Sequence, residues 1–212
     1  MPIAYDNATA QSELQGTTLT YSHTTGAGSN RALIVYAYTN NNSDIVTGVT
    51  YGGVAMTLID KVINIASAGC IYAYFLANPA SGTNNVVCSQ SNSSNYMSAV
   101  AISYTGVKQT DNPEVYTDVN TTSSGSTLSL TTTTADCWLL LMQRGCWTSV
   151  TSSLTQRGYS SCGYIWDSNA GVGAGSNSAG FSSGATNSHG TILFALAPAL
   201  EVSTFIPKII MF

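Results

Sequence analysis

Apolar and polar residues alternate along this chain in short runs, and no long stretch keeps the 3.6-residue apolar spacing of an amphipathic helix. Strand-like runs recur instead, separated by turn-forming stretches such as "GAGSN" and "NPASGTNN". No helical crossover is expected between them. This pattern predicts an all-β fold, an antiparallel two-sheet β-sandwich that is jelly-roll-like and has few or no helices.

The stretch "IVTGVTYGGVAMTLID" at residues 45–60 contains a Gly-Gly pair between two alternating runs. A phosphate-binding loop would need a helix after the glycines, and none is expected. A two-residue hairpin turn needs positive φ at its centre, which glycine supplies. We therefore predict that Gly52 and Gly53 form a turn that pairs residues 47–51 with 54–59.

Two kinds of strand are expected. Residues 127–131, "TLSLT", alternate cleanly, which is typical of a strand with one face in water. "RALIVYAY", "CWLLLM" and "GTILFALA" are almost continuously apolar, which indicates that both faces are covered. In a two-sheet sandwich, that cover would come from a long loop or a neighbouring subunit, so the pattern favours a homo-oligomer.

The composition excludes several partners. Only 8% of the residues are charged, against about 25% in ordinary soluble proteins. The net charge is −4 and the six Lys and Arg residues are scattered, which argues against nucleic acid and against a polybasic membrane patch. The apolar runs are shorter than the roughly 18 residues of a membrane helix. The N-terminus has no signal-peptide pattern, so we expect cytoplasmic synthesis and release by another route, such as lysis of a host cell by a phage.

The five cysteines show no zinc-binding spacing. We expect buried thiols, with a Cys137–Cys146 or a Cys146–Cys162 bridge as alternatives that the spacing leaves open. Asp111, Glu114 and Asp118 supply clustered carboxylate oxygens of the kind that Ca²⁺ prefers, but their spacing is not that of an EF-hand loop and a solvated loop is favoured. No metal and no cofactor is predicted.

The motif "GFSSG" at residues 180–184 matches the pattern of a hydrolase nucleophile turn, with His189 shortly after it. That turn requires a strand followed by a helix, and an acidic residue between the serine and a distant histidine. No acid lies between Ser182 and His189. His23 and His189 are the two histidines, and both are expected to be ordinary strand or loop residues. We predict that the protein is not an enzyme.

Residues 144–188 carry four aromatic side chains among Gly, Ser and Asn: Trp147, Tyr159, Tyr164 and Trp166. Aromatic rings flanked by small polar residues stack on sugar rings or serve as adaptable contacts. The alternative is that they pack beneath long loops. They are the candidate ligand-binding residues, with glycans as the candidate ligand.

The last twelve residues, "EVSTFIPKIIMF", are unusually apolar for a chain end. Its large apolar residues are Val202, Phe205, Ile206, Ile209, Ile210, Met211 and Phe212. These are the candidate assembly residues, and folding back onto the same domain is the alternative.

Four short segments resemble a β-sandwich module that recurs in bacterial surface proteins and in phage virion proteins: "SNRALIVYAY", "VTYGGVAMT", "FLANPASGTNNVV" and "AISYTGV". The resemblance covers about residues 17–198 and implies a non-catalytic display or binding module. Such modules often occur in tandem, whereas here one is followed by an apolar tail, which favours the virion role over a surface adhesin.

Together these patterns predict an N-terminal arm (1–16), a β-sandwich domain (17–198) and an apolar tail (199–212). The expected function is that of a structural virion protein of a phage-like particle, a capsid or tail coat or decoration protein that self-assembles. Its expected partners are copies of itself and other virion proteins, and its location is the virion, outside the cell after cytoplasmic synthesis. A carbohydrate-binding or adhesive surface module is the alternative.

Overall fold

The computed structural model describes residues 1–66, 68–145 and 150–200. Strands make up 70% of the structure, and the described residues contain no helix. All strand pairs are antiparallel, which confirms the predicted all-β sandwich. The described residues form three sheets rather than the expected two. The jelly-roll arrangement stays a prediction.

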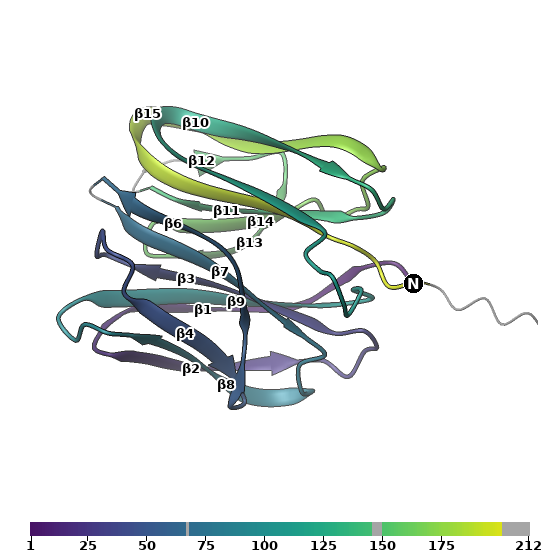
Figure 1. Ribbon diagram of the computed structural model, residues 1–212, viewed down its shortest axis with the longest axis horizontal. Helices are drawn as coiled ribbons and strands as arrows, with labels where there is room; N and C mark the ends of the chain where they lie inside the picture. Colours follow the sequence, from purple (N-terminus) through teal and green to yellow (C-terminus); the bar gives the residue numbers. More distant parts are fainter. Residues whose placement is uncertain (67, 146–149, 201–212) are drawn as a thin grey trace, which may run out of the picture.

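The three sheets stack as layers, as Figure 1 shows. The central sheet has the order β1 (Ala4–Gln15), β9 (Tyr96–Thr105), β3 (Ala32–Thr39), β7 (Gly69–Ala77) and β6 (Thr57–Ile65). The small sheet has the order β2 (Thr18–Thr25), β8 (Gly82–Gln90), β4 (Val46–Tyr51) and β5 (Val54–Ala55). The large sheet has the order β10 (Val115–Thr132), β15 (Gly175–Leu196), β11 (Trp138–Arg144), β14 (Gly163–Asp167) and β13 (Thr155–Ser160), and β12 (Val150–Thr151) pairs with β15.

Strand β3 explains why the central sheet is apolar on both faces. All eight of its residues are buried. Ile34 and Tyr36 pack in the core shared with the large sheet, whereas Leu33 and Val35 pack in the core shared with the small sheet. The prediction that its continuous apolar run is covered on both sides is therefore confirmed. The cover is supplied by other sheets of the same chain, so this pattern does not require a neighbouring subunit.

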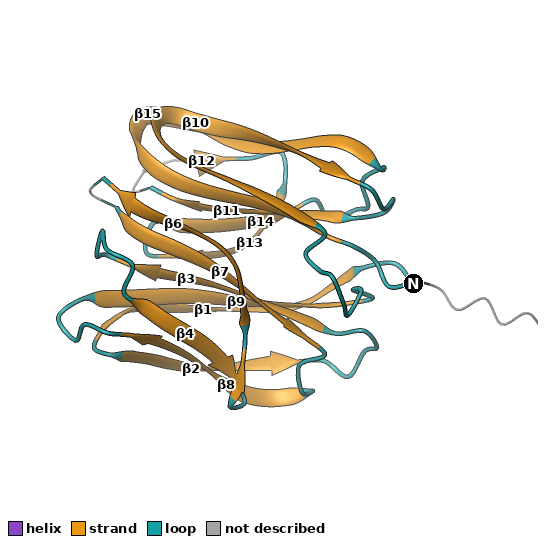
Figure 2. Cartoon of the chain, viewed as in Figure 1, coloured by secondary structure: helices purple, strands orange, loops and turns teal. Residues whose placement is uncertain are grey.

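The outer face of the large sheet is covered in a different way, by the paired ends of its two longest strands, β10 and β15. β10 and β15 pair along almost their whole length, with a register shift between Ser123 and Gly125. Beyond this shift, Leu128 and Phe181 pack in one core with Leu139 and Leu141 of β11. Residues 125–132 of β10 and 175–182 of β15, which pair beyond the register shift, therefore fold over the sheet to which the rest of these two strands belongs. Figure 2 shows the two long strands curving over β11 and β14.

The predicted turn at Gly52 and Gly53 is present. Both residues have positive φ, 55° and 81°, and Tyr51 pairs with Val54. The predicted pairing is shorter than expected, because β5 ends at Ala55. The chain then crosses to the central sheet as β6. The sequence did not reveal this crossing, because strands of either sheet show the same alternating pattern.

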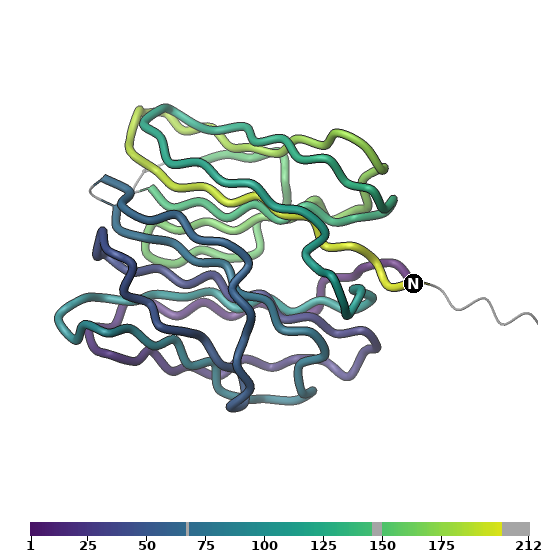
Figure 3. Tube along the Cα trace, viewed as in Figure 1, coloured from purple at the N-terminus to yellow at the C-terminus, as the bar shows by residue number. Residues whose placement is uncertain are grey.

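The two ends of the described chain meet. Residues 1–16, expected to be an arm, supply β1, which pairs with β9 at the edge of the central sheet. The backbone trace in Figure 3 brings the purple start and the yellow end together, and the Met1 amino group donates a hydrogen bond of 3.0 Å to the Ala199 carbonyl oxygen.

Candidate functional site

Three of the predicted ligand-binding aromatics lie together on the outer side of the large sheet. Tyr159 and Tyr164 are cross-strand partners on β13 and β14, with ring centroids 4.7 Å apart and ring planes tilted by 53°. Tyr164 stacks on Trp166 at 5.4 Å and 10°, and Trp166 stacks on Phe181 at 6.1 Å and 6°. We call these four residues the aromatic row.

The aromatic row runs from solvent into the core. Tyr159 is 48% exposed, whereas Trp166 is 2% exposed and belongs to the core beneath the folded ends of β10 and β15. Tyr164 is half-buried, and burial, with the charge of Tyr159, raises its pKa. Packing is therefore the role of Trp166, as the alternative interpretation held, and Tyr159 and Tyr164 are the members that reach the surface. Trp147 lies outside the described residues.

Two polar side chains that sequence reasoning missed continue this row across the sheet. Gln143 of β11 pairs with Tyr164 on one side and with Thr191 of β15 on the other. Both are fully buried, and Gln143 Oε1 and Thr191 Oγ1 are among the buried atoms that have no hydrogen-bond partner. The only signal in the sequence was the position of each polar residue at the end of an apolar run: Gln143 follows "WLLLM" and Thr191 precedes "ILFALA". Strand register, which the sequence does not reveal, brings them beside the aromatic pair.

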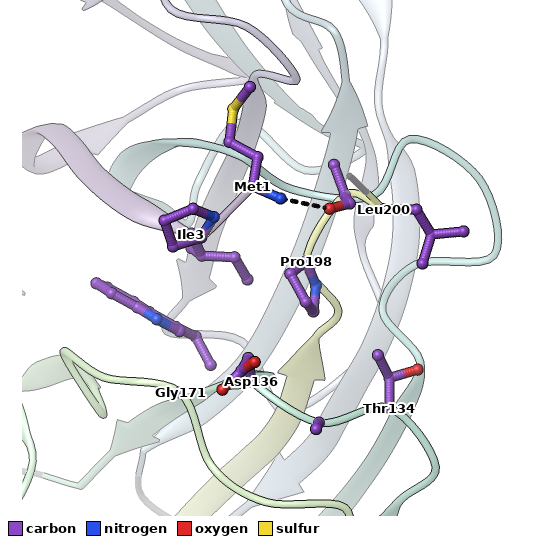
Figure 4. A pocket seen from close by; sticks show the side chains of 11 residues that line it. Met1, Ile3, Thr134, Asp136, Gly171, Pro198 and Leu200 are labelled. Atoms are coloured by element: carbon purple, nitrogen blue, oxygen red, sulfur yellow. Dashed lines mark hydrogen bonds between the residues drawn. The ribbon is translucent and has the colours of Figure 1, made fainter. Parts of the chain in front are cut away.

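A pocket of about 450 Å³ lies where the two chain ends meet, at one end of the interface between the central and large sheets. It is lined by Met1, Pro2, Ile3, Thr134, Ala135, Asp136, Trp138, Gly171, Pro198, Ala199 and Leu200. Figure 4 shows Ile3, Pro198 and Asp136 around its opening, and Leu200 beside the hydrogen bond of Met1. Apolar side chains dominate this lining, and the sequence offered no sign of it because its parts come from four separate segments.

The predicted assembly residues all follow the last pocket residue, Leu200, in the sequence. Val202, Phe205, Ile206, Ile209, Ile210, Met211 and Phe212 are outside the described residues. The last described residue, Leu200, lines the pocket and is 82% exposed. The apolar tail therefore starts at the pocket.

The hydrolase-like motif lies in a strand and lacks the required geometry. Ser182 is part of β15, and its hydroxyl group is 3.0 Å from that of Thr151. His189 Nε2 lies 2.6 Å from the hydroxyl of Ser126, and its Nδ1 lies 3.2 Å from the Asn187 carbonyl oxygen. The histidine thus contacts a different serine from the one in the motif, and its second nitrogen lies beside a backbone carbonyl oxygen rather than a carboxylate.

His23 belongs to a buried network between the central and small sheets. Its Nδ1 is 3.0 Å from Thr9 Oγ1 and its Nε2 is 3.2 Å from Ser103 Oγ, which in turn donates a 2.7 Å hydrogen bond to Asp6. Burial lowers the pKa of His23 to about 4, although the charge of Asp6 opposes this shift. The serine, not the histidine, contacts the acid, so the order differs from that of a catalytic triad.

A second buried network joins the central and large sheets. Asp167 is fully buried and accepts hydrogen bonds from Arg157 Nε at 2.7 Å and from the Tyr104 hydroxyl at 2.9 Å. The guanidinium group of Arg157 also lies over the ring of Tyr5, 4.2 Å from its centroid. Both members of the ion pair contact other protein groups, Asp167 through Tyr104 and Arg157 through Tyr5. The pair therefore holds the two sheets together and does not resemble a reactive acid and base.

The remaining candidates for metal or redox chemistry are dispersed. Asp111 lies 3.9 Å from Lys108, whereas Glu114 accepts hydrogen bonds from Thr133 and Thr134, so these carboxylates hold separate loops. The described residues contain no group of three or more His, Cys, Asp and Glu placed to hold a metal ion.

The cysteines fall into two groups. Cys70, Cys88 and Cys137 are free and buried, which confirms their expected role as small apolar residues. Because Cys137 is free, the Cys137–Cys146 alternative is wrong. Cys162 is disulfide-bonded, and Cys146 lies outside the described residues.

Comparisons with known proteins leave this geometry as the main guide to function. The sequence matches no protein-family profile, and it matches no curated protein. Over the described ranges, no helix is long and apolar enough to cross a membrane.

Proposed function

We propose that this chain is a non-enzymatic structural protein that self-assembles, as a coat or decoration protein of the capsid or tail of a phage-like particle. Its partners are then other copies of itself and other virion proteins, and it is made in the cytoplasm and ends in the virion. Its low charge supports this role, because charged surfaces normally keep soluble proteins apart. The serine, histidine and acidic side chains described above are engaged in bonds that hold strands together, which supports a role without catalysis.

The observation that carries the proposal is the apolar pocket from which the apolar tail departs. The pocket volume, about 450 Å³, lies within the roughly 300–1,000 Å³ that is typical of ligand-binding pockets. Each large apolar side chain of residues 201–212 that leaves water contributes roughly 1.5–3 kcal/mol, before the entropy of ordering the segment is subtracted. The tail of one copy is the proposed occupant of the pocket of the next.

Charge complementarity points in the same direction. Lys208 is the one cationic side chain of the tail, and Asp136 is an exposed carboxylate on the pocket wall. A contact between the tail of one copy and the pocket of another joins two different surfaces, so it generates a closed ring or an open filament when each copy passes its tail to the next. Both are arrangements that a coat or a tail tube uses.

The experiment compares the oligomeric mass of three proteins by size-exclusion chromatography with light scattering. The intact chain is expected to form a discrete oligomer or a filament, and the chain ending at residue 200 is expected to be a folded monomer. Ala135→Trp, which fills the pocket from an exposed position, is expected to be monomeric with its tail intact. Thermal unfolding verifies that both variants fold.

Two results would contradict the proposal. A monomeric intact chain would remove the assembly role, and the tail would then belong to its own domain if its deletion also lowered stability. An oligomer that survives both variants would show that another surface mediates association.

A further inference from the structure

We propose that Tyr159 and Tyr164 form a binding site for a neutral hexopyranose, with the apolar face of the sugar ring lying on the tyrosine pair. This is a binding function beyond assembly, and it does not depend on the oligomeric state of the protein. It rests on the shape, the rigidity, the charge and the unused hydrogen-bonding groups of this part of the large sheet.

The tyrosine pair has the shape of a platform. Tyr159 is half exposed on β13, the edge strand of the large sheet, so solvent reaches it without passing another strand. The two ring centroids lie 4.7 Å apart and the ring planes are tilted by 53°, so the rings meet at a steep angle rather than in a flat stack. The axial C–H groups of a hexopyranose fit against such aromatic faces, and the tyrosine hydroxyl groups remain available for polar contacts.

The platform is rigid. Tyr164 stacks on the buried Trp166, and Trp166 stacks on the buried Phe181. These contacts hold the ring of Tyr164 in one orientation before any ligand arrives. Preorganisation of this kind lowers the entropy lost on binding, which matters for a small ligand with few contacts.

The surroundings favour a neutral sugar over an acidic one. The charged residues of β13 and β14 are Arg157 and Asp167, and they are paired with each other at 2.7 Å. On the neighbouring strand β11, Arg144 lies over the ring of Tyr38, in the interface with the central sheet. No unpaired cation of these three strands is therefore available to a carboxylate or a sulfate group.

Unused hydrogen-bonding capacity lies directly behind the platform. Gln143 and Thr191 follow Tyr164 across the sheet on the same face, and Gln143 Oε1 and Thr191 Oγ1 are buried without partners. Buried polar atoms normally have a partner, either in the protein or in ordered water. A hydroxyl group of the sugar, linked through a bridging water, would complete these two groups.

The chain offers a matched control for the platform. Tyr116 on β10 is 53% exposed, close to the exposed fraction of Tyr159. Among the described residues it makes no ring contact, so it is an exposed tyrosine without a platform. Nonspecific adhesion of sugars to tyrosine would involve both residues equally.

The experiment begins with the intact protein on an array of glucose-, galactose- and mannose-terminated oligosaccharides, with sialylated and sulfated glycans as the acidic set. Retention of neutral members over acidic ones is expected. The affinity for the best neutral oligosaccharide is then measured by NMR titration for Tyr159→Ala, Tyr159→Phe and Tyr116→Ala. Tyr159→Ala is expected to weaken binding by about tenfold or more, a typical loss for an aromatic anchor.

Tyr159→Phe is expected to retain binding within about threefold, because stacking survives the loss of the hydroxyl group. Tyr116→Ala is expected to bind as the parent does. The proposal is overturned if no neutral glycan is retained, if acidic glycans are preferred, or if Tyr159→Ala and Tyr116→Ala have equal affinities. Unchanged thermal unfolding of the two half-exposed tyrosine variants separates lost binding from lost folding.

Discussion

Two buried polar networks, one on each face of the central sheet, start from consecutive residues of β9. Ser103 points towards the small sheet, where it contacts His23 and Asp6. Tyr104 points towards the large sheet, where it donates to Asp167, the partner of Arg157. Because successive side chains of a strand point to opposite faces, one strand anchors a polar contact in each of two apolar cores.

Both networks bury ionisable side chains between two sheets, but they differ in the charge that these side chains carry. The pKa of His23 is lowered to about 4 by burial, so the imidazole is neutral at pH 7. On the other face, burial lowers the pKa of Arg157, but the hydrogen bond and charge of Asp167 outweigh it and raise that pKa. One interface thus keeps its buried base uncharged and the other pairs its buried charges, and we expect them to respond differently to mutation and to acid.

The largest expected effect is that of Asp167→Ala. It leaves the Arg157 guanidinium and the Tyr104 hydroxyl without their shared acceptor in the core. Breaking a buried ion pair by removing one partner costs about 3–5 kcal/mol, so urea denaturation should show a loss of stability of that size. Asp111→Asn is the control, because asparagine tolerates the positive φ of 47° at this position, the Asp111 side chain is 89% exposed and its contact with Lys108 is 3.9 Å long. Equal losses of unfolding free energy in the two variants would mean that the Asp167 network does not stabilise the contact between the sheets.

Acid should weaken the other network first. Unfolded His23 binds a proton as the pH falls below about 6.5, whereas folded His23 stays neutral down to about 4. Proton uptake therefore favours the unfolded chain in this window, and stability should fall by up to about 3 kcal/mol between pH 6.5 and 4.

Stability curves of the parent and His23→Gln, measured in urea at several pH values, test this prediction. The slope between pH 6.5 and 4.5 should become smaller in the variant, and the part that remains should include His189, whose pKa burial also lowers. Glu114 contributes at lower pH, because hydrogen bonds from Thr133, Cys137 and Thr134 outweigh burial and lower its pKa to about 2. If the free energy of unfolding changes with pH equally in the parent and in His23→Gln, His23 is not the acid-sensitive group.

The turn at Gly52 and Gly53 contains no buried polar network, so a substitution there gives a reference for the effects at the two networks. Gly53→Val should cost on the order of 1 kcal/mol or more, because a β-branched residue resists a φ of 81°. No atom lies within 4 Å of the added Cβ position, so the cost comes from the backbone alone. Gly48→Val on the preceding strand is the control, since its site is equally open and its φ is not positive. Thermal unfolding should rank Gly53→Val well below Gly48→Val.

The smallest expected effect is that of Ser182→Ala. Its hydroxyl group contacts Thr151 at the surface, and surface changes of this kind stay within about 0.5 kcal/mol. Neither the parent nor the variant should hydrolyse ester or peptide substrates. Turnover that disappears in Ser182→Ala would instead reveal a catalytic serine, and the non-enzymatic proposal would fail.

Sequence reasoning located part of the candidate site. The aromatic cluster was visible because large rings stand out among Gly, Ser and Asn, but the pattern did not separate the exposed Tyr159 from the buried Trp166. Gln143 and Thr191 were missed because their place beside Tyr164 depends on strand register. The pocket was missed because no local pattern tells that residues 1–3, 134–138 and 198–200 meet.

The sequence by itself determined most of the strands, although not β1, together with the turn at Gly52 and Gly53 and the burial of both faces of β3. These follow from local physics: a period of two residues, the need of a tight turn for positive φ, and the cost of leaving a continuous apolar run in water. Only the tertiary structure decided what covers each face. Alternation assigns side chains to faces but does not identify what packs against each face, so a third sheet, a folded pair of strands and a neighbouring subunit satisfy the same pattern equally well. The choice depended on packing between residues far apart in the chain, as when Leu128 of β10 and Phe181 of β15 close over Leu141.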